Sequence, residues 1–572
     1  MKLGQVVSGI CGSAPSSSSG LHSAKSWRSS ALRIADQMQR LEGPWWDPAE
    51  KAFYHVVCSS DGKRLRVFAT SCSTLLMPTK GEDDREWMQG DELHANGLYI
   101  RKVRIRADEQ TGGVIRKIYQ QRAWSTPSTL RLLTREEEDA VGRYLSLSYV
   151  WEALEKYDTV LIKGSWLIKW ISTGQPLPRR QELPKEASWD PAELRLLVEK
   201  FEVFLMALSY CWSASHHPDA NGEQMKVLSA LLQTRLKVKY HDQSPVYHDA
   251  GIFIDWCSLH QECRGESLSS AEQCSRQRGL HLASLWYAHE RIEAWLMTKV
   301  PRGVMPYDKR GWPTFEKALA SLITPDHMLL DIGQYNDQEH ALWPQIYGAC
   351  KAGRSPPMTP EVFNAALAQL GFSKSSDLAL LQDMYTTTFK EVLAGVQELA
   401  FSNLNWIDTE AEILSEALPY CEAVEKIDLK SNDIGASGAA AIFKSAVQCP
   451  KLEVISLTKN PLGDDASHAI SSYLPELAAL KTLWLNECEI GDDGITAFMR
   501  ELPLCQGLRN FYVFDNAITD EGAKEIIEIL PQCPFLVQFG IGGNSINEDT
   551  ISKLQKSWES CDREQGNCIY VR

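Results

Sequence analysis

A leucine-containing pattern recurs every 28 residues in the last third of this chain, and it constrains the fold more than any other feature. The pattern LxxLxLxxNxI begins at Val424, Leu452, Leu480, Leu508 and Leu536. A degenerate sixth copy begins at Val396, where it would cap the array. Each copy joins a short strand to a helix, and one copy cannot bury its apolar face alone. Residues 396–560 are therefore expected to form a curved α/β solenoid of stacked repeats.

The period and the pattern resemble the ribonuclease-inhibitor class of intracellular leucine-rich repeats. This resemblance implies a horseshoe whose concave surface binds another macromolecule. In such a strand the leucines point into the core, and the alternating positions face the concave surface. The central exposed position reads Ala400, Asp428, Ser456, Trp484, Tyr512 and Gly540 along the array.

Two aromatic residues of this series, Trp484 and Tyr512, should be neighbours on adjacent strands, about 4.8 Å apart along the ladder. Phe514 should face outward as well. Aromatic side chains grouped on a solvent face are typical of a protein-binding hot spot. The predicted charged rim consists of Lys430, Lys459, Glu487 and Asp515. The alternative is that the aromatic rings pack against each other or against the preceding domain.

Residues 196–335 have the alternation of an α/β unit with a largely parallel sheet. Short apolar runs predict strands at 204–210, 251–255 and 292–297, and helical patterns lie at 223–236, 271–289 and 312–322. Three motifs follow these strands: Ser209-Tyr210-x-Trp212, Asp255-x5-Gln261 and Arg310-Gly311-Trp312-x3-Glu316. Their order and spacing resemble the heterokaryon-incompatibility domain, which is related to the flavodoxin-like Toll/interleukin-receptor (TIR) domains. Ser213, Ser258 and Pro313 depart from the patterns of these families.

Some TIR domains cleave NAD with the glutamate that Glu316 would match here. A carboxylate suits this reaction because the transition state resembles an oxocarbenium ion. The resemblance would make Glu316 catalytic and would let Tyr210 and Trp212 stack on the substrate. The other substrate-binding residues that it implies are Asp255, toward a ribose hydroxyl, with Gln261, Arg310 and Trp312. The alternative is structural: Arg310 and Glu316 form an ion pair, and Trp212 and Trp312 belong to the core.

Other chemistry has weaker support. Cys257, His260, Cys263 and Cys274 are ligand-type residues, but their spacing matches no common zinc pattern. A thiol–imidazole pair of Cys257 with His260 or His289 rests on no spatial argument. No GxxxxGK[ST] motif is present, so a P-loop nucleotide switch is not expected. We expect no metal and no cofactor, with NAD only as the substrate of the hydrolase hypothesis.

The remaining segments carry no visible chemistry. Residues 1–42 are Ser-rich and are expected to be disordered, whereas 43–195 are expected to be β-rich with a helical lead-in to the next domain. Asp61-Gly62 and Thr111-Gly112-Gly113 predict hairpin turns between strands. A helix is expected at 136–157 and a Pro-rich connection at 175–190. Residues 324–395 look mostly helical, and 336–395 are assigned as the connector to the repeats.

The bulk composition narrows the partners and the location. The formal net charge of −15 argues against nucleic acid, because binding a polyanion needs clustered Lys and Arg. Fifteen scattered cysteines favour free thiols in a reducing compartment, so we expect a cytoplasmic location. No apolar run has the length of a membrane span.

The sequence thus predicts an interaction or sensor protein. Its repeats would bind a protein partner, and its TIR-like domain would act in signalling, with homo-oligomers forming through that domain. A second hypothesis is an NAD glycohydrolase regulated by the repeats. A third treats both domains as a scaffold.

Overall fold

The structure is a computed structural model of the chain. It describes the backbone of the strands between residues 43 and 132, and residues 142–571 apart from 157, 201, 215, 240–245, 263–266 and 561–567. The predicted disordered segment 1–42 and the predicted turn residues 61–62 and 111–113 lie outside the described residues. The chain forms two compact units, Met1–Glu138 with Glu199–Phe201, and Asp139–Val198 with Glu202–Arg572.

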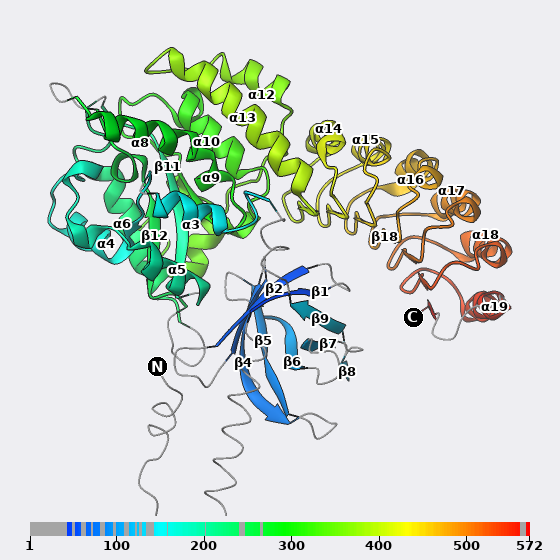
Figure 1. Ribbon diagram of the computed structural model, residues 1–572. Coiled ribbons are helices and arrows are strands. Elements are labelled where there is room, and N and C mark those ends of the chain that lie inside the picture. Colours follow the sequence, from blue (N-terminus) through cyan, green and yellow to red (C-terminus); the bar gives the residue numbers. More distant parts are fainter. Residues whose placement is uncertain are drawn as a thin grey trace, which may run out of the picture. The chain divides into compact units, whose positions relative to one another are not determined.

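The described part of the N-terminal unit is an antiparallel sheet (Figure 1). Its strands are β1 (Gly43–Asp47), β2 (Ala52–Cys58), β3 (Leu65–Ala69), β4 (Cys72–Lys80), β5 (Glu86–His94), β6 (Tyr99–Ala107), β7 (Val114–Gln120), β8 (Ala123–Trp124) and β9 (Ser128–Leu132). Their order is β6-β5-β4-β3-β2-β1-β9-β7-β8, and β6 also pairs with β7, so the sheet closes on itself. Both predicted hairpins are confirmed, because β2 pairs antiparallel with β3 and β6 with β7.

The second unit begins with a five-stranded sheet in the order β10-β12-β11-β13-β14. The strands are β10 (Ile162–Lys163), β11 (Val203–Tyr210), β12 (Asp249–Phe253), β13 (Glu293–Met297) and β14 (Leu329–Asp331). All neighbours are parallel except β10, which runs antiparallel to β12 at the edge. Every residue of β11 is buried, as expected for a central strand covered on both faces.

The three predicted strands of this sheet are confirmed as β11, β12 and β13, although β12 ends two residues earlier than predicted. Asp255 instead begins the short helix α7 (Asp255–Ser258). The predicted parallel α/β character is thereby confirmed for this part of the chain.

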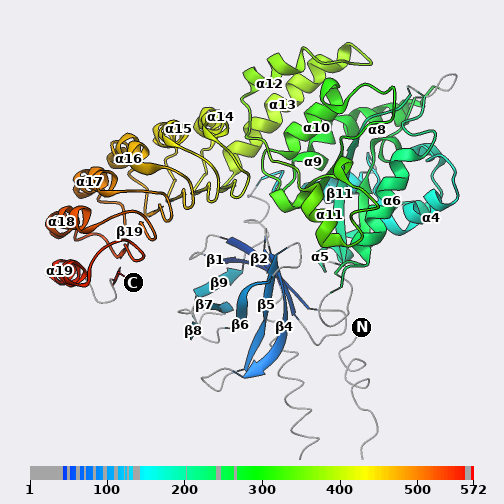
Figure 2. The same cartoon turned by 180° about the vertical axis from the view of Figure 1, so that it is seen from behind.

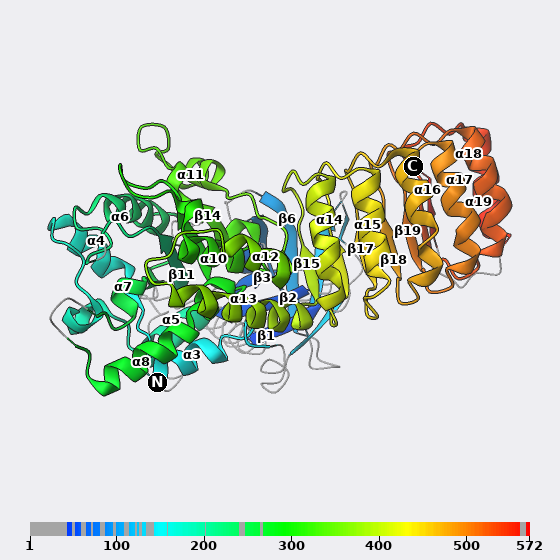
Figure 3. The same cartoon turned by 90° about the horizontal axis from the view of Figure 1, so that it is seen from above.

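Helices lie on both sides of this sheet in the view from above (Figure 3). They are α3 (Ser148–Glu155), α4 (Gly164–Ser172), α5 (Pro191–Glu199), α6 (Glu223–Leu236), α8 (Ser270–His281), α9 (Ala283–Ala288) and α10 (Gly311–Ala320). The helix predicted at 223–236 is confirmed as α6. The helix predicted at 271–289 is interrupted at Leu282 and forms α8 and α9. Short 3-10 helices are η2 (Arg180–Glu182), η3 (Lys185–Ala187), η4 (Tyr307–Lys309), η5 (Asp326–Met328) and η6 (Ile332–Gln334).

Two further predictions need correction. In the described part of the helix expected at 136–157, α3 begins only at Ser148, and turns precede it from Gly142, whose φ of 109° interrupts a right-handed helix. Within the predicted α/β domain 196–335, Leu329–Asp331 joins the sheet as β14, a strand that the mostly helical pattern of 324–395 did not predict. Pairing with β13 and burial of Leu329 and Leu330 decide this conformation, and local helix propensity does not.

The rest of the connector is helical, with α11 (Trp343–Cys350), α12 (Pro360–Leu367) and α13 (Ser376–Gly395). Helix α13 packs against α9 and α10 and leads directly into the first repeat. Arg354 fixes this junction. Its guanidinium is 3% exposed and donates to the carbonyls of Ser321, Leu322 and Ala400, while its own carbonyl accepts from the Trp406 indole at 2.8 Å. The α/β region and the repeats consequently share one hydrophobic core.

The repeats form a solenoid with strands along its inner side and helices along its outer side (Figures 1 and 2). The strands are β15 (Glu398–Ala400), β16 (Lys426–Asp428), β17 (Val454–Ser456), β18 (Thr482–Trp484), β19 (Asn510–Tyr512), β20 (Gln538–Gly540) and β21 (Cys568–Tyr570). The helices are α14 (Asp408–Ala417), α15 (Ala436–Ala446), α16 (Gly463–Ser471), α17 (Asp492–Glu501), α18 (Asp520–Ile529) and α19 (Glu548–Glu559). Short 3-10 helices follow four of them: η7 (Leu418–Tyr420), η8 (Leu474–Glu476), η9 (Leu502–Leu504) and η10 (Leu530–Gln532).

The parallel ladder places equivalent residues of successive repeats side by side. Ile455, Leu483 and Phe511 occupy one such row, and none of the three is exposed. The predicted inward phase of the leucine positions is confirmed. The degenerate copy also contributes a strand, β15, whereas β21 was not predicted.

Two ladders of polar side chains hold the repeats in register. Asn516 represents the first: its amide donates to the Leu485 carbonyl at 2.8 Å, and its Oδ1 accepts from the Ile490 N–H at 3.1 Å. Asp492 represents the second, because its Oδ1 accepts from the N–H groups of Thr519 and Gly522 at 2.7 and 3.0 Å. Each such Asp caps the helix of the following repeat and complements the positive end of its dipole.

One turn departs from this scheme. Ala436 replaces the capping Asp of its repeat, and Cys488 replaces the ladder Asn. Gly463, at the start of α16, donates its N–H to the Cys488 carbonyl at 3.0 Å. Its φ is 63°, whereas the equivalent Gly435 and Gly491 have extended backbones. Because Ala436 and Cys488 lack the side-chain acceptors that Asp and Asn supply in the other repeats, the backbone turn that begins α16 has a different conformation.

Candidate functional site

Aromatic side chains form a stacked row on the strand side of the solenoid. The rings of Trp484 and Tyr512 lie 3.9 Å apart at 21°, and those of Tyr512 and Phe514 lie 6.0 Å apart at 17°. The 28-residue period causes the first contact, because Trp484 and Tyr512 are direct partners in the ladder. The row is extended by Tyr570 of β21, whose ring lies 6.3 Å from that of Phe514.

The row is only partly open to solvent. Tyr512 is 7% exposed, since it lies between the other rings and its hydroxyl donates to the Gln538 side chain. Trp484 and Phe514 are half-buried, and Tyr570 is 41% exposed. A Cβ at Gly540 would meet the Phe514 ring at 2.3 Å, so glycine makes room for the row there. The rings pack against each other, as the alternative interpretation expected, yet Trp484 and Phe514 still present surface.

The four residues predicted as the charged rim are exposed. Lys459 and Glu487 form an ion pair at 3.1 Å. Lys459, Glu487 and Asp515 occupy one repeated position whose φ is 61°, 52° and 52°, in the left-handed region that side chains other than Gly and Asn rarely adopt. The rim therefore comes from the turns directly after the strands, next to the aromatic row in sequence.

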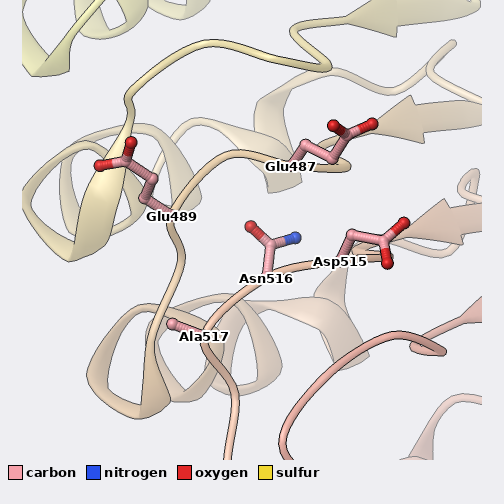
Figure 4. Close-up of a pocket in the computed structure, with 5 residues that line it drawn as sticks. All are labelled: Glu487, Glu489, Asp515, Asn516 and Ala517. Carbon is pink, nitrogen blue, oxygen red and sulfur yellow. The ribbon is translucent and has the colours of Figure 1, made fainter.

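A pocket of about 610 Å³ lies beside this rim (Figure 4). Its lining residues are Glu487, Glu489, Asp515, Asn516 and Ala517. Figure 4 shows Glu487 and Asp515 on neighbouring turns and Glu489 on the other side of Asn516. Glu489 and Tyr570 belong to this surface and were missed in the sequence. Glu489 follows the Asn/Cys position of its repeat, and the strand pattern does not predict where side chains beyond that position lie. Tyr570 lies on β21, whose sequence matches no repeat.

The α/β region contains a second group of predicted residues, around Glu316. Glu316 is 8% exposed and accepts a hydrogen bond from the Ser209 hydroxyl at 2.5 Å. Ser209 also lies 2.5 Å from the Tyr307 hydroxyl, and Tyr287 donates to the Leu208 carbonyl nearby. Helix α10 supplies Glu316, and the end of β11 supplies Ser209. The carboxyl is consequently enclosed by hydroxyl groups.

Burial dominates the electrostatics of this cluster. It raises the pKa of the Glu316 carboxyl well above its ordinary value, and the contacts with Ser209 and Tyr287 only partly oppose the rise. Burial likewise raises the pKa values of Tyr287 and Tyr307 well above those of free tyrosine. Burial therefore favours the protonated form of Glu316 in this conformation. Tyr287 and Tyr307 were not predicted, because neither belongs to the three motifs.

Five predicted residues form a group of contacts next to this cluster. The Trp212 indole donates to the Asp255 carboxylate at 2.9 Å, and Arg310 donates to the Trp212 carbonyl at 3.0 Å. The Gln261 amide donates to the Asp255 carbonyl at 2.8 Å. Tyr210, which is 5% exposed, lies beside Asp255; burial raises the pKa of Asp255, and the contacts with Tyr210 and Trp212 oppose the rise.

Trp312 is not part of this group. Its indole donates to the Asp377 carboxylate of α13 at 2.9 Å, and its ring packs on Phe315. Within the described residues Arg310 and Glu316 form no ion pair, because each bonds to the partners given above. Trp312 thus packs against the core, as the structural alternative expected. The ion pair between Arg310 and Glu316 that the same alternative expected does not form among the described residues.

The cysteine–histidine alternatives gain no support. The Cys257 thiol donates to the Pro178 carbonyl at 3.2 Å, and burial raises its pKa. Burial lowers the pKa of His289 to about 3. Cys263 lies outside the described residues. Among the residues that the structure describes, no group of three or more ligand-type side chains is arranged to hold a metal.

Comparisons with known proteins identify the repeats. A Leucine Rich repeat family model matches residues 420–443, 479–499 and 505–526, so the chain contains leucine-rich repeats. No curated protein matches the sequence. None of the helices in the described part of the chain combines the length and hydropathy that a membrane crossing requires.

Several solved structures are similar over part of the chain. Leiomodin-1 Actin-Binding Site 2 is 16% identical, covering 25% of this chain and 85% of its own, with a TM-score of 0.23. The tropomodulin C-terminal domain of Caenorhabditis elegans is 10% identical, covering 26% and 92%, with a TM-score of 0.24. Internalin C2 of Listeria monocytogenes is 18% identical, covering 29% and 70%, with a TM-score of 0.20. TM-scores this low do not establish a shared overall fold.

Proposed function

We propose that this protein is an interaction or sensor protein whose repeats, of the ribonuclease-inhibitor type, bind a protein partner on the concave face. One observation carries the proposal: Trp484 and Phe514 present aromatic surface on the strand side, held rigid by stacking on Tyr512. A few anchor residues, among which aromatic side chains such as Trp and Tyr are enriched, supply most of the binding energy in protein interfaces. We place this function in the cytoplasm, on the basis of the scattered cysteines.

Site-specific photo-crosslinking tests the proposal. The photoreactive residue p-benzoylphenylalanine would replace Tyr570 or Lys430 on the concave side, and exposed Glu416 or Glu528 on the helical side as matched controls. The full-length protein is then irradiated in extract of its native cells. We expect one protein to be crosslinked from the concave positions only. Crosslinks from the helical side alone would contradict the proposal.

For residues 196–335 we propose a TIR/heterokaryon-incompatibility-like domain that acts in signalling and forms homo-oligomers. The support is the parallel order β12-β11-β13-β14, which is the order of a flavodoxin-like sheet, and the convergence of two motifs beyond β11. Light scattering of the full-length protein tests the oligomer. A mass equal to that of one chain at all concentrations would contradict it.

NAD hydrolysis is the second candidate function. The observation that favours it is the grouping of Glu316 with Ser209 near Tyr210 and Asp255 at the carboxyl end of the central strand. The enclosure of Glu316 and the raised pKa of its buried carboxyl act against it, because stabilising a developing cation requires an ionised carboxylate that reaches the substrate. Catalysis would therefore require this cluster to open.

The test is to incubate the full-length protein with NAD and to measure nicotinamide by chromatography. If Glu316 is catalytic, Glu316→Gln should lower turnover by ~100-fold or more while keeping the fold, since the isosteric amide still accepts from Ser209. Absence of nicotinamide release by the folded wild-type protein would leave the scaffold interpretation for this domain. Undiminished activity in Glu316→Gln would place the reaction elsewhere.

A further inference from the structure

The net negative charge of this protein comes entirely from its repeats. Residues 396–560 contain 26 Asp and Glu against 11 Lys and Arg, a net charge of −15, which equals the formal charge of the entire chain. The remaining residues are balanced, with 48 of each sign. A field of one sign attracts a partner of the opposite sign and accelerates its approach. The repeats therefore favour a cationic binding partner.

Unpaired carboxylates lie next to the aromatic row. Within the described residues, the side chains of Glu489 and Asp515 form no ion pair and no hydrogen bond, whereas Glu487 is paired with Lys459. Both unpaired carboxylates line the 610 Å³ pocket of Figure 4. A positively charged group entering this pocket would meet two acceptors that no residue of the described chain already occupies.

Two residues of the aromatic row lie close in sequence to residues that line this pocket. Phe514 is adjacent to Asp515 in the chain, and Trp484 lies three residues before Glu487. An Arg guanidinium stacks flat on an aromatic ring and forms forked hydrogen bonds with a carboxylate. A Lys ammonium interacts with both groups as well, but as a compact charge without the planar fit. Half-buried rings beside unpaired carboxylates thus have the chemistry that recognises basic side chains.

We propose that Trp484, Phe514, Glu489 and Asp515 form a docking surface for an Arg- or Lys-rich segment of the protein partner. This inference rests on the proposed function of the repeats and adds the chemistry of the partner. The negative field repels polyanions, which excludes nucleic acid at this surface. The basic segment lies across β18 to β20, with its cationic side chains at the turns after these strands.

Fluorescence anisotropy with a defined probe tests the inference on the full-length protein. The probe is labelled nona-arginine, and nona-glutamate is the negative control. The variant Glu489→Gln/Asp515→Asn removes the two unpaired carboxylates and leaves the Lys459–Glu487 pair intact. The matched control Glu416→Gln/Glu528→Gln removes the same charge from exposed positions on the helices.

We expect the first variant to weaken binding of nona-arginine about tenfold, and the matched control to change it less than twofold. Labelled nona-lysine serves as a second basic probe. Because only Arg stacks flat on an aromatic ring, Trp484→Ala should weaken the binding of nona-arginine more than that of nona-lysine. Equal losses in the two double variants would overturn the inference, because the attraction would then be diffuse charge alone. Failure of the wild-type protein to bind either basic probe would overturn it as well.

Two further measurements separate this inference from the proposed function. If crosslinking from Tyr570 persists in Glu489→Gln/Asp515→Asn, the repeats bind a protein and the basic-segment inference fails. If crosslinking is reduced in that variant and unchanged in the matched control, both statements are supported. Dissociation of a dimer of this chain by the first variant, seen by light scattering, would identify a second copy as the occupant and overturn the inference.

Discussion

Replacing Leu483 by alanine should destabilise the solenoid strongly. Leu483 lies at the centre of β18, between Ile455 and Phe511 on adjacent strands, and none of the three is exposed. The substitution removes three buried carbons, a transfer loss of about 2.4 kcal/mol at ~0.8 kcal/mol for each carbon. A cavity flanked on both sides by well-packed repeats collapses poorly, so we expect a total of ~3 to 4 kcal/mol.

Thermal unfolding followed by circular dichroism measures this effect. A loss of ~3 kcal/mol lowers Tm by about 6 to 12 °C for a cooperative unit of ~150 to 250 residues. Lys430→Ala is the control, because Lys430 is exposed and its truncation should stay within ~0.5 kcal/mol. Equal shifts for the two variants would refute the assignment of inward and outward positions.

Two other predictions concern stability. Asp492→Ala should lower the free energy of unfolding by ~1 kcal/mol, because Asp492 caps α18. Asp493→Ala, at the adjacent exposed position, should lower it far less. Similar losses of unfolding free energy for the two variants in urea would contradict the capping role of Asp492. Burial raises the pKa of Glu290 to about 7, so its contribution to stability is complete at acidic pH and is lost as the pH rises through 7. Stability should therefore fall between pH 5 and pH 8, and Glu290→Gln should flatten this fall; an identical pH profile in the variant would contradict the shift.

The repeats could be predicted from sequence because their signal is periodic. Each copy supports the next, and the inward phase of Leu483 follows from the same pattern that gives the strand. Elements without such repetition were less predictable. The strand Leu329–Asp331 was not predicted, because its three residues form a strand only by pairing with β13, a contact that no local pattern encodes. The interruption between α8 and α9 at Leu282 likewise has no Pro to announce it, and the one nearby glycine, Gly279, lies within α8.

The candidate sites could be predicted only in part, for a physical reason. Spacing along a ladder fixes which residues are neighbours, so the stacking of Trp484 on Tyr512 was foreseeable. Spacing does not give exposure, and the near-complete burial of Tyr512 depends on Phe514 and on the hydrogen bond to Gln538. The third motif likewise gives only the spacing of Trp312 and Glu316 along the chain. Packing separates them, with Trp312 directed to α13 and Glu316 to the end of β11.

The crosslink from Tyr570 measured in Trp484→Ala tests the central claim most directly. Leu504→Ala is the control, because Leu504 is an exposed apolar residue, 64% exposed, at the end of the helix of the same repeat. A central aromatic anchor contributes ~2 kcal/mol or more to binding, so we predict that the crosslinked partner falls at least about tenfold in Trp484→Ala and is unchanged in Leu504→Ala. An undiminished crosslink in folded Trp484→Ala would contradict the claim that the aromatic row binds the partner.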